Sequence, residues 1–182
     1  STFQILDSAD QLAMIKRILK NLSVDEKKFS PRQVQWFINS AKEAGLRAAD
    51  VTVDDAFSRH MLEFYQVYEQ QCQKEGAVDF AELLLRSFEL LSRNEILCHH
   101  YRERFQYILV DEFQDTNTLQ YAWLKLLAGV GTEHIAAVCV VGDDDQSIYA
   151  FRGAHSGNMR DFERDFGITN IIRLEQNYRS HG

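Results

Sequence analysis

The sequence has little of several features that would place it in a special class of protein. Its 182 residues include one proline, nine glycines and three cysteines. The cysteines, Cys72, Cys98 and Cys139, lie far apart and form no Cys-x-x-Cys pair, so neither a disulfide framework nor a zinc site is expected. Apolar runs fall far short of the roughly 20 residues that span a bilayer, and no charged-then-apolar leader opens the sequence. We therefore expect a cytoplasmic protein without membrane contact, and the 45% hydrophobic content predicts an ordered core.

An excess of positive charge is also missing, because 20 basic and 27 acidic residues give a net charge of −7. This sign is wrong for a protein that would hold nucleic acid by overall attraction. One segment differs, since eight basic side chains outnumber three acidic ones from Lys16 to Arg47. A solvated helix face is the simpler interpretation of this excess, and a phosphate-binding surface is the alternative.

The first hundred residues have the apolar periodicity of helices. Ser8 with Gln11 is expected to form a capping box at the start of the first helix. A second helix is expected to have Ser30 as its cap, Pro31 in its first position and Gln33 reaching back to the cap, and to stop near Gly45. A third helix is expected from about Thr52 to Glu75, and a fourth begins after a cap formed by Asp79 with Glu82. The side chains of the second and fourth helices expected in the core are Trp36, Phe37, Ala41, Ala44, Leu83, Leu84, Phe88 and Leu91.

After Tyr101 the apolar pattern changes to short buried-strand runs that alternate with helices. The expected strands are Tyr107–Val110, Ala137–Val141 and Ile171–Leu174, and the expected helices between them run from about Asn117 to Ala128 and from about Asn158 to Phe166. This order predicts an α/β fold with a parallel sheet and right-handed crossovers. Ligands of such sheets bind beyond the carboxyl ends of the strands, where three polar clusters fall in this sequence.

The first polar cluster is Asp111-Glu-Phe-Gln-Asp115. Asp and then Glu at a strand end suit phosphate hydrolysis, because Asp111 can hold Mg²⁺ through water while Glu112 can orient and deprotonate an attacking water. A bare Asp-Glu pair is more often a solvated strand end, and only the longer string favours a site.

The second cluster runs from Gly142 to Ala154 and begins with three successive aspartates, whose mutual repulsion favours a cation, a basic partner or full solvation. Gln146, which can both donate and accept, suits a group that reads a terminal phosphate or its water. The residues that follow, which could stack unpaired bases and hold a phosphate, are Tyr149, Phe151 and Arg152. Taken alone, such aromatic residues are more often part of a core.

The third cluster, from Leu174 to Ser180, places Tyr178 and Arg179 just past the last expected strand. Arg179 could neutralise charge on a transferring γ-phosphoryl group. An ordinary ion pair is the simpler interpretation of an isolated arginine.

The three clusters together resemble motifs II, III and IV of the superfamily 1A DNA helicases, the UvrD, Rep and PcrA group. The matching strings are Asp111 to Asn117, Val141 to Tyr149 with Arg152 to Ala154, and Leu174 to Ser180. The first half resembles the 1B domain of that group, most closely its UvrD branch, in the strings Phe3 to Ser8, Pro31 to Gln33 and Val78 to Leu84. The resemblance covers essentially the whole chain.

The resemblance implies a helical 1B-like domain in residues 1–100 and part of a RecA-like 1A motor domain in residues 101–182. It implies ATP and Mg²⁺ as cofactors, and single-stranded DNA, single-strand/double-strand junctions and DNA-repair proteins as partners. By matching position, it assigns Mg²⁺ binding to Asp111 and the role of catalytic base to Glu112. It assigns sensing of the γ-phosphate to Gln146, packing near adenine to Tyr178 and the role of arginine finger to Arg179. The residues that it assigns to the link between nucleotide and single-stranded DNA are Tyr149, Phe151 and Arg152.

Two departures from the family pattern qualify what the resemblance implies. Phe151 stands where family members usually have tryptophan, so the ring there is smaller and has no indole donor. No glycine in the sequence is followed by lysine, so the phosphate-binding loop Gly-x-x-x-x-Gly-Lys-Ser/Thr is absent from it. We therefore expect an inactive fragment of an ATP-dependent 3′ to 5′ DNA helicase of the UvrD type. The alternatives are a fragment of a Rep-like or nuclease-fused relative and a stand-alone DNA- or protein-binding module derived from a helicase.

Overall fold

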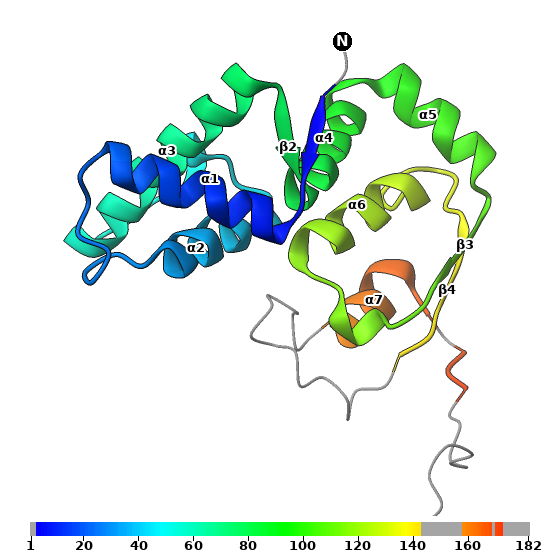
Figure 1. Cartoon of the computed structure of the whole chain (residues 1–182). Coiled ribbons are helices and arrows are strands. Elements are labelled where there is room, and N and C mark those ends of the chain that lie inside the picture. The colour runs from blue at the N-terminus through cyan, green and yellow to red at the C-terminus, as the bar shows by residue number, and fades with distance from the viewer. Residues whose placement is uncertain (1–2, 143–157, 169, 173–182) are drawn as a thin grey trace, which may run out of the picture.

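The computed structural model describes residues 3–142, 158–168 and 170–172 (Figure 1). These residues form a mixed helix and strand structure with two separate pairs of parallel strands. The larger, N-terminal part is mainly helical, and the second strand pair lies with its helices in the C-terminal part. This architecture agrees with the α/β fold expected from the sequence.

The N-terminal part is built from five α-helices and one short strand pair. Strand β1 (Gln4–Leu6) lies parallel to β2 (Ala77–Asp79), a pair that the sequence did not reveal. The helices are α1 (Ser8–Asn21), α2 (Pro31–Glu43), α3 (Ala56–Glu75), α4 (Phe80–Arg93) and α5 (Glu95–Arg104), with a short 3₁₀ turn at Ala48–Asp50. Helix α5 was also missed, because it buries only Cys98 and so has almost no apolar periodicity.

The ends of these helices show where local sequence signals are sufficient. Ser30 and Gln33 form the expected capping box of α2 with Pro31 in the first turn, and Asp79 caps α4 by accepting from the N–H of Glu82 at 2.7 Å. The expected cap of α1 was wrong by one residue, because the carboxylate of Asp7 accepts from two free backbone amides at 2.8 Å.

The start of α3 and two core positions also differ from expectation. Helix α3 begins at Ala56, four residues after the expected start, because Asp55 accepts from the N–H of Ser58 and caps it there. Trp36 is 63% exposed and Ala44 is exposed as well, so both predictions of burial were wrong. The buried face of α2 follows Val34, Ile38 and Ala41 instead.

The C-terminal part places helices on one face of a parallel strand pair. Strand β3 (Tyr107–Val110) lies parallel to β4 (Ala137–Val140), and α6 (Thr118–Ala128) connects them. A short 3₁₀ turn (Phe113–Asp115) follows β3, and α7 (Asn158–Phe166) comes after β4. Helices α6 and α7 lie on the same side of the strands (Figure 1). These strands and helices confirm the sequence prediction closely.

The third expected strand is not formed by the described residues of its segment. Ile171 and Ile172 have no strand geometry and are 57% and 80% exposed, and the rest of that segment lies outside the described residues. The strands β3 and β4 are also buried on one face only. Ile108 and Val138 face the helices, whereas Tyr107 and Leu109 are 84% and 74% exposed.

Three apolar clusters form the core of the described structure. The largest is made by β1, α1, α2 and α3 with the start of β2, and its members all lie between Leu6 and Ala77. The second packs α6 and α7 against β3 and β4, and the third joins α4, α5 and α6 through Leu91, Cys98 and Leu127. None of the helices in the described part combines the length and the apolar character needed to cross a bilayer.

Candidate active site

The carboxyl end of β3 carries the first polar cluster that the sequence indicated. The pairing continues past the ends of β3 and β4. The N–H of Val141 donates to the carbonyl oxygen of Val110 at 2.8 Å, and the N–H of Phe113 donates to the carbonyl oxygen of Val141 at 2.9 Å. The side chain of Phe113 is fully buried, with its ring centroid 5.3 Å from that of Phe162 in α7. The chain that follows β3 is therefore held firmly against the end of β4.

Asp111 and Glu112 lie between these anchors, and both are exposed. Glu112 has φ 50° and ψ 42°, the left-handed region, which costs a residue with a side chain about 1–2 kcal/mol. Its N–H donates to Oδ1 of Asp111 at 2.9 Å, and its carbonyl oxygen accepts from the N–H of Asp115 at 3.0 Å. This sharp turn presents two neighbouring carboxylates to solvent at a strand end, the arrangement that a metal-assisted hydrolytic site needs.

Gln114, which the sequence interpretation left without a role, is the buried partner of this turn. Only 7% of Gln114 is exposed, and its Nε2 donates to Oε2 of Glu112 at 2.6 Å. Gly142, the first residue of the second polar cluster, passes against it: a Cβ at this glycine would lie 2.9 Å from Oε1 of Gln114. The sequence signal that could have indicated this role is the position of Gln114, two residues after Glu112 within the Asp111–Asp115 string.

The other predicted site residues lie outside the described part of the chain. These are Gln146, Tyr149, Phe151, Arg152, Tyr178 and Arg179. The structure therefore places Asp111 and Glu112 together and leaves the remaining assignments as predictions. Within the described ranges, no group of three or more His, Cys, Asp and Glu side chains could hold a metal ion.

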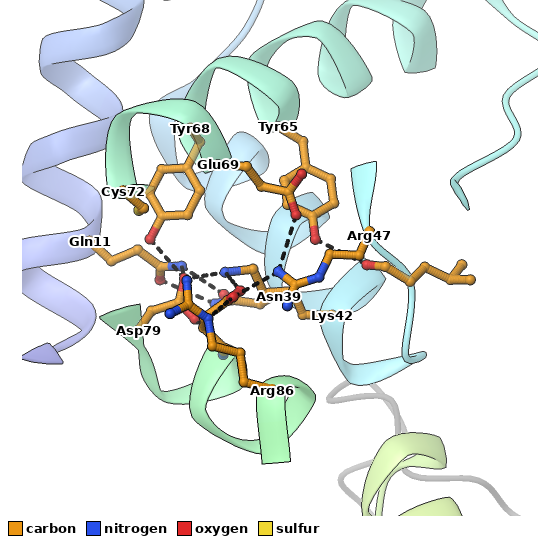
Figure 2. Close-up of polar contacts among 12 residues, drawn as sticks. Gln11, Asn39, Lys42, Arg47, Tyr65, Tyr68, Glu69, Cys72, Asp79 and Arg86 are labelled. Atoms are coloured by element: carbon orange, nitrogen blue, oxygen red, sulfur yellow. Dashed lines mark hydrogen bonds and ion pairs between the residues drawn. The ribbon is translucent and has the colours of Figure 1, made fainter. Parts of the chain in front are cut away.

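A second concentration of charge lies inside the helical part, and the sequence did not predict it (Figure 2). Lys42 is only 2% exposed, and its Nζ lies 2.7 Å from Oδ2 of Asp79 and 2.9 Å from Oε2 of Glu82. The same Oδ2 accepts from the hydroxyl of Tyr68 at 2.7 Å and from Nε2 of Gln11 at 3.2 Å. Side chains from α1, α2, α3 and α4 thus meet at the cap of α4.

Arg47 extends this buried charge cluster toward the surface. Its guanidinium donates to both carboxylate oxygens of Glu89 at 2.8 Å and to Oε1 of Glu82 at 2.7 Å, an oxygen that also accepts from Arg86 at 2.6 Å. A cavity of about 430 Å³ lies beside the cluster, lined by Lys42, Arg47, Glu69, Cys72, Gln73, Glu82 and Arg86.

The electrostatics show that these groups stabilise one another. Burial by itself raises the pKa of Glu82, but Lys42, Arg47 and Arg86 outweigh burial and lower this pKa to about 2. Burial and the charge of Asp79 raise the pKa of the Tyr68 hydroxyl, which therefore stays protonated as a donor. The cluster is a structural clamp between helices.

This cluster also decides part of the question raised by the basic segment from Lys16 to Arg47. Lys42 and Arg47 are engaged in ion pairs inside the fold and do not belong to a phosphate-binding surface. Lys16, Arg17 and Lys20 are exposed along α1, where either a solvated helix face or a phosphate-binding surface would place them.

Comparison with known proteins places the chain in one family. Residues 1–167 match the UvrD/REP helicase N-terminal domain. The chain belongs to this helicase family. DNA helicase II of Haemophilus influenzae and of Escherichia coli are each 51% identical to it over 179 residues, and the ATP-dependent DNA helicase PcrA of Staphylococcus aureus is 42% identical over 180. Each alignment covers 98% of the chain but 24% of the relative, so the chain spans about a quarter of the length of these helicases.

Proposed function

We propose that this chain is a segment of an ATP-dependent 3′ to 5′ DNA helicase or translocase of the UvrD type, acting in DNA repair or replication. The observation that carries the proposal is the turn at the end of β3, where Asp111 and Glu112 face solvent beside the end of β4. Membership in the helicase family supports the same conclusion. ATP hydrolysis by the full-length protein would supply the free energy for movement along a single strand.

In this proposal the carboxylates of Asp111 and Glu112 have different roles in phosphate hydrolysis. Asp111 would hold Mg²⁺, and Glu112 would accept a proton from the attacking water at a carboxylate oxygen. A single aspartate fits Mg²⁺, because this ion commonly keeps several waters and is held by one or two carboxylates together with substrate phosphates. When bound, the ion would neutralise charge that develops on the phosphates. Gln146 would form a hydrogen bond with the γ-phosphate or its attacking water, and Arg179 would stabilise the negative charge of the γ-phosphate. Tyr178 would pack near adenine.

We further propose that residues 1–100 form the 1B-like domain and that residues 101–182 form the later part of the RecA-like 1A domain. Support comes from two of the apolar clusters, since the largest draws on residues between Leu6 and Ala77 and the second on residues between Ile108 and Ile168. The third cluster joins α4 and α5 to α6 and so spans the proposed boundary. Tyr149, Phe151 and Arg152 would link the nucleotide to single-stranded DNA, including single-strand/double-strand junctions.

The test is Glu112→Gln in the full-length protein, which removes the proton acceptor and keeps the shape of the side chain. We expect kcat for ATP hydrolysis to fall by about 100-fold or more with ATP binding largely intact. Glu133→Gln is the matched control, because Glu133 is exposed in the loop before β4 and should leave kcat unchanged. A normal kcat for Glu112→Gln would show that the base is assigned wrongly.

A further inference from the structure

Gln114 is a buried side chain that donates a hydrogen bond to the proposed catalytic base. Glu112 itself is exposed, so packing does not restrict its side chain to one orientation. The hydrogen bond of 2.6 Å from Nε2 of Gln114 to Oε2 of Glu112 does restrict it. It engages Oε2, one of the two oxygens of the carboxylate.

The position of Gln114 is itself determined by the strands. The preceding residue, Phe113, is fully buried, and its N–H donates to the carbonyl oxygen of Val141 at 2.9 Å. Its carbonyl oxygen accepts from the N–H of Thr116 at 3.1 Å, which closes the short turn. The amide of Gln114 is therefore a donor on a rigid support, and the orientation of Glu112 is tied to the sheet through it.

Gln114 also contacts the start of the second polar cluster. A Cβ at Gly142 would lie 2.9 Å from Oε1 of Gln114 and 3.3 Å from its backbone nitrogen. A side chain at position 142 would crowd the amide of Gln114, so the end of β4 and this amide occupy adjoining space.

We propose that Gln114 is a positioning residue for ATP hydrolysis, which orients the Glu112 carboxylate. The inference rests on the proposed function, because it concerns the group proposed as the base. A correctly oriented carboxylate accepts the proton of the attacking water in line with the reaction, and a misplacement of about 1 Å is enough to cost about 100-fold in rate.

The experiment is a double-mutant cycle in the full-length protein, with single-turnover ATP hydrolysis as the measurement. Gln114→Met keeps the length and removes the donor, and Glu112→Gln removes the group that Gln114 is proposed to orient. We expect Gln114→Met alone to lower the hydrolysis rate about 10- to 100-fold with the KM for ATP within about twofold of the parent value. In the Glu112→Gln background the same change should have no further effect, because no base remains to be oriented.

Gln120→Met is the matched control for the substitution itself. Gln120 is exposed and caps α6 through a hydrogen bond from the N–H of Asn117, so its loss should leave the hydrolysis rate unchanged. If Gln114→Met fails to fold, Gln114→Leu takes its place, since it removes the amide donor without adding a charge beside Glu112.

Two results would overturn the positioning role: an unchanged rate in Gln114→Met, or an equal loss in the parent and Glu112→Gln backgrounds. Failure of the proposed function would look different, because Glu112→Gln alone would then leave the hydrolysis rate normal.

Discussion

At the scale of single residues, the described site depends on one uncommon backbone conformation. Glu112 and Ser23 are the non-glycine residues with positive φ among the described residues. At Glu112 the cost of this conformation is offset by the N–H bond to Asp111, the side-chain bond from Gln114 and the buried ring of Phe113. Backbone strain of this kind is often found at functional sites, which agrees with the proposed role of Glu112.

Phe151 is the residue at which the sequence departs from its family, and it carries its own prediction. If the ring stacks on DNA bases, Phe151→Ala in the full-length protein should cost about 1 to 3 kcal/mol of single-strand affinity with little dependence on base sequence. Phe151→Trp should tighten binding at a stacking site, because the ring is larger.

The same pair of variants distinguishes a core position. In a packed core the larger ring of Phe151→Trp would overpack its surroundings by about 1 to 3 kcal/mol. A lower melting temperature for both variants, with affinity per folded molecule unchanged, would rule out the DNA contact.

At the scale of elements, the buried charge cluster joins helices α1 to α4. Lys42→Met should lower the free energy of unfolding by about 3–5 kcal/mol, because Asp79 and Glu82 would lose a buried cationic partner. Arg17→Met is the control, since the pair of Arg17 with Glu75 is solvent-exposed and should be worth less than about 1 kcal/mol. Urea unfolding of the two variants measures both values, and equal losses would show that the cluster does not act as a clamp.

The low pKa of Glu82 predicts how stability changes with pH. In the folded protein this pKa is about 2 and its ordinary value is 4.5, so Glu82 stabilises the fold above about pH 4.5. That stabilisation, about 3 kcal/mol from the two pKa values, is lost as the pH falls from 4.5 toward 2. Unfolding free energies at pH 6 and pH 2.5 should therefore differ less in Glu82→Gln than in the parent protein. An unchanged difference would contradict the low pKa.

The elements themselves were largely predictable where their signals are local. The caps of α2 and α4 and the start of α6 at Asn117 each depend on side chains within three residues of the free amides, so the sequence contains them directly. Strands β1 and β2 have three residues each, too few for an alternating pattern, and their pairing joins Gln4 to Ala77 across the helical part. Such a pair cannot be predicted from either segment alone.

At the scale of the whole molecule, the described strands β3 and β4 leave one face of their pair exposed. Parallel sheets are usually covered on both faces, yet Tyr107 and Leu109 are largely exposed and Cys139 is exposed beside them. This exposure agrees with a chain that spans about a quarter of the length of its relatives.

The missing phosphate-binding loop gives a prediction for the 182-residue chain by itself. Asp111 and Glu112 could still bind a metal ion and orient a water, but the sequence has no loop whose amides and lysine would bind the phosphates. We expect no measurable release of phosphate from ATP, even with single-stranded DNA present. Turnover that Glu112→Gln abolishes would overturn this expectation. Binding of single-stranded DNA without turnover is the result that the alternative of a stand-alone binding module predicts.

The sequence by itself determined the caps of α2, α4 and α6, the strands that lead into the first two polar clusters and the position of the Asp-Glu pair at a strand end. These features arise from interactions between neighbours in the chain or from apolar periodicity, which a sequence states directly. Only the tertiary structure decided that Lys42 is buried against Asp79, 37 residues away, and that Trp36 is exposed. It also decided that Gln114 holds Glu112 while Gly142 passes against its amide. Burial and side-chain orientation depend on residues far apart in the chain, because distant segments supply the partners and the enclosing surface that a side chain needs.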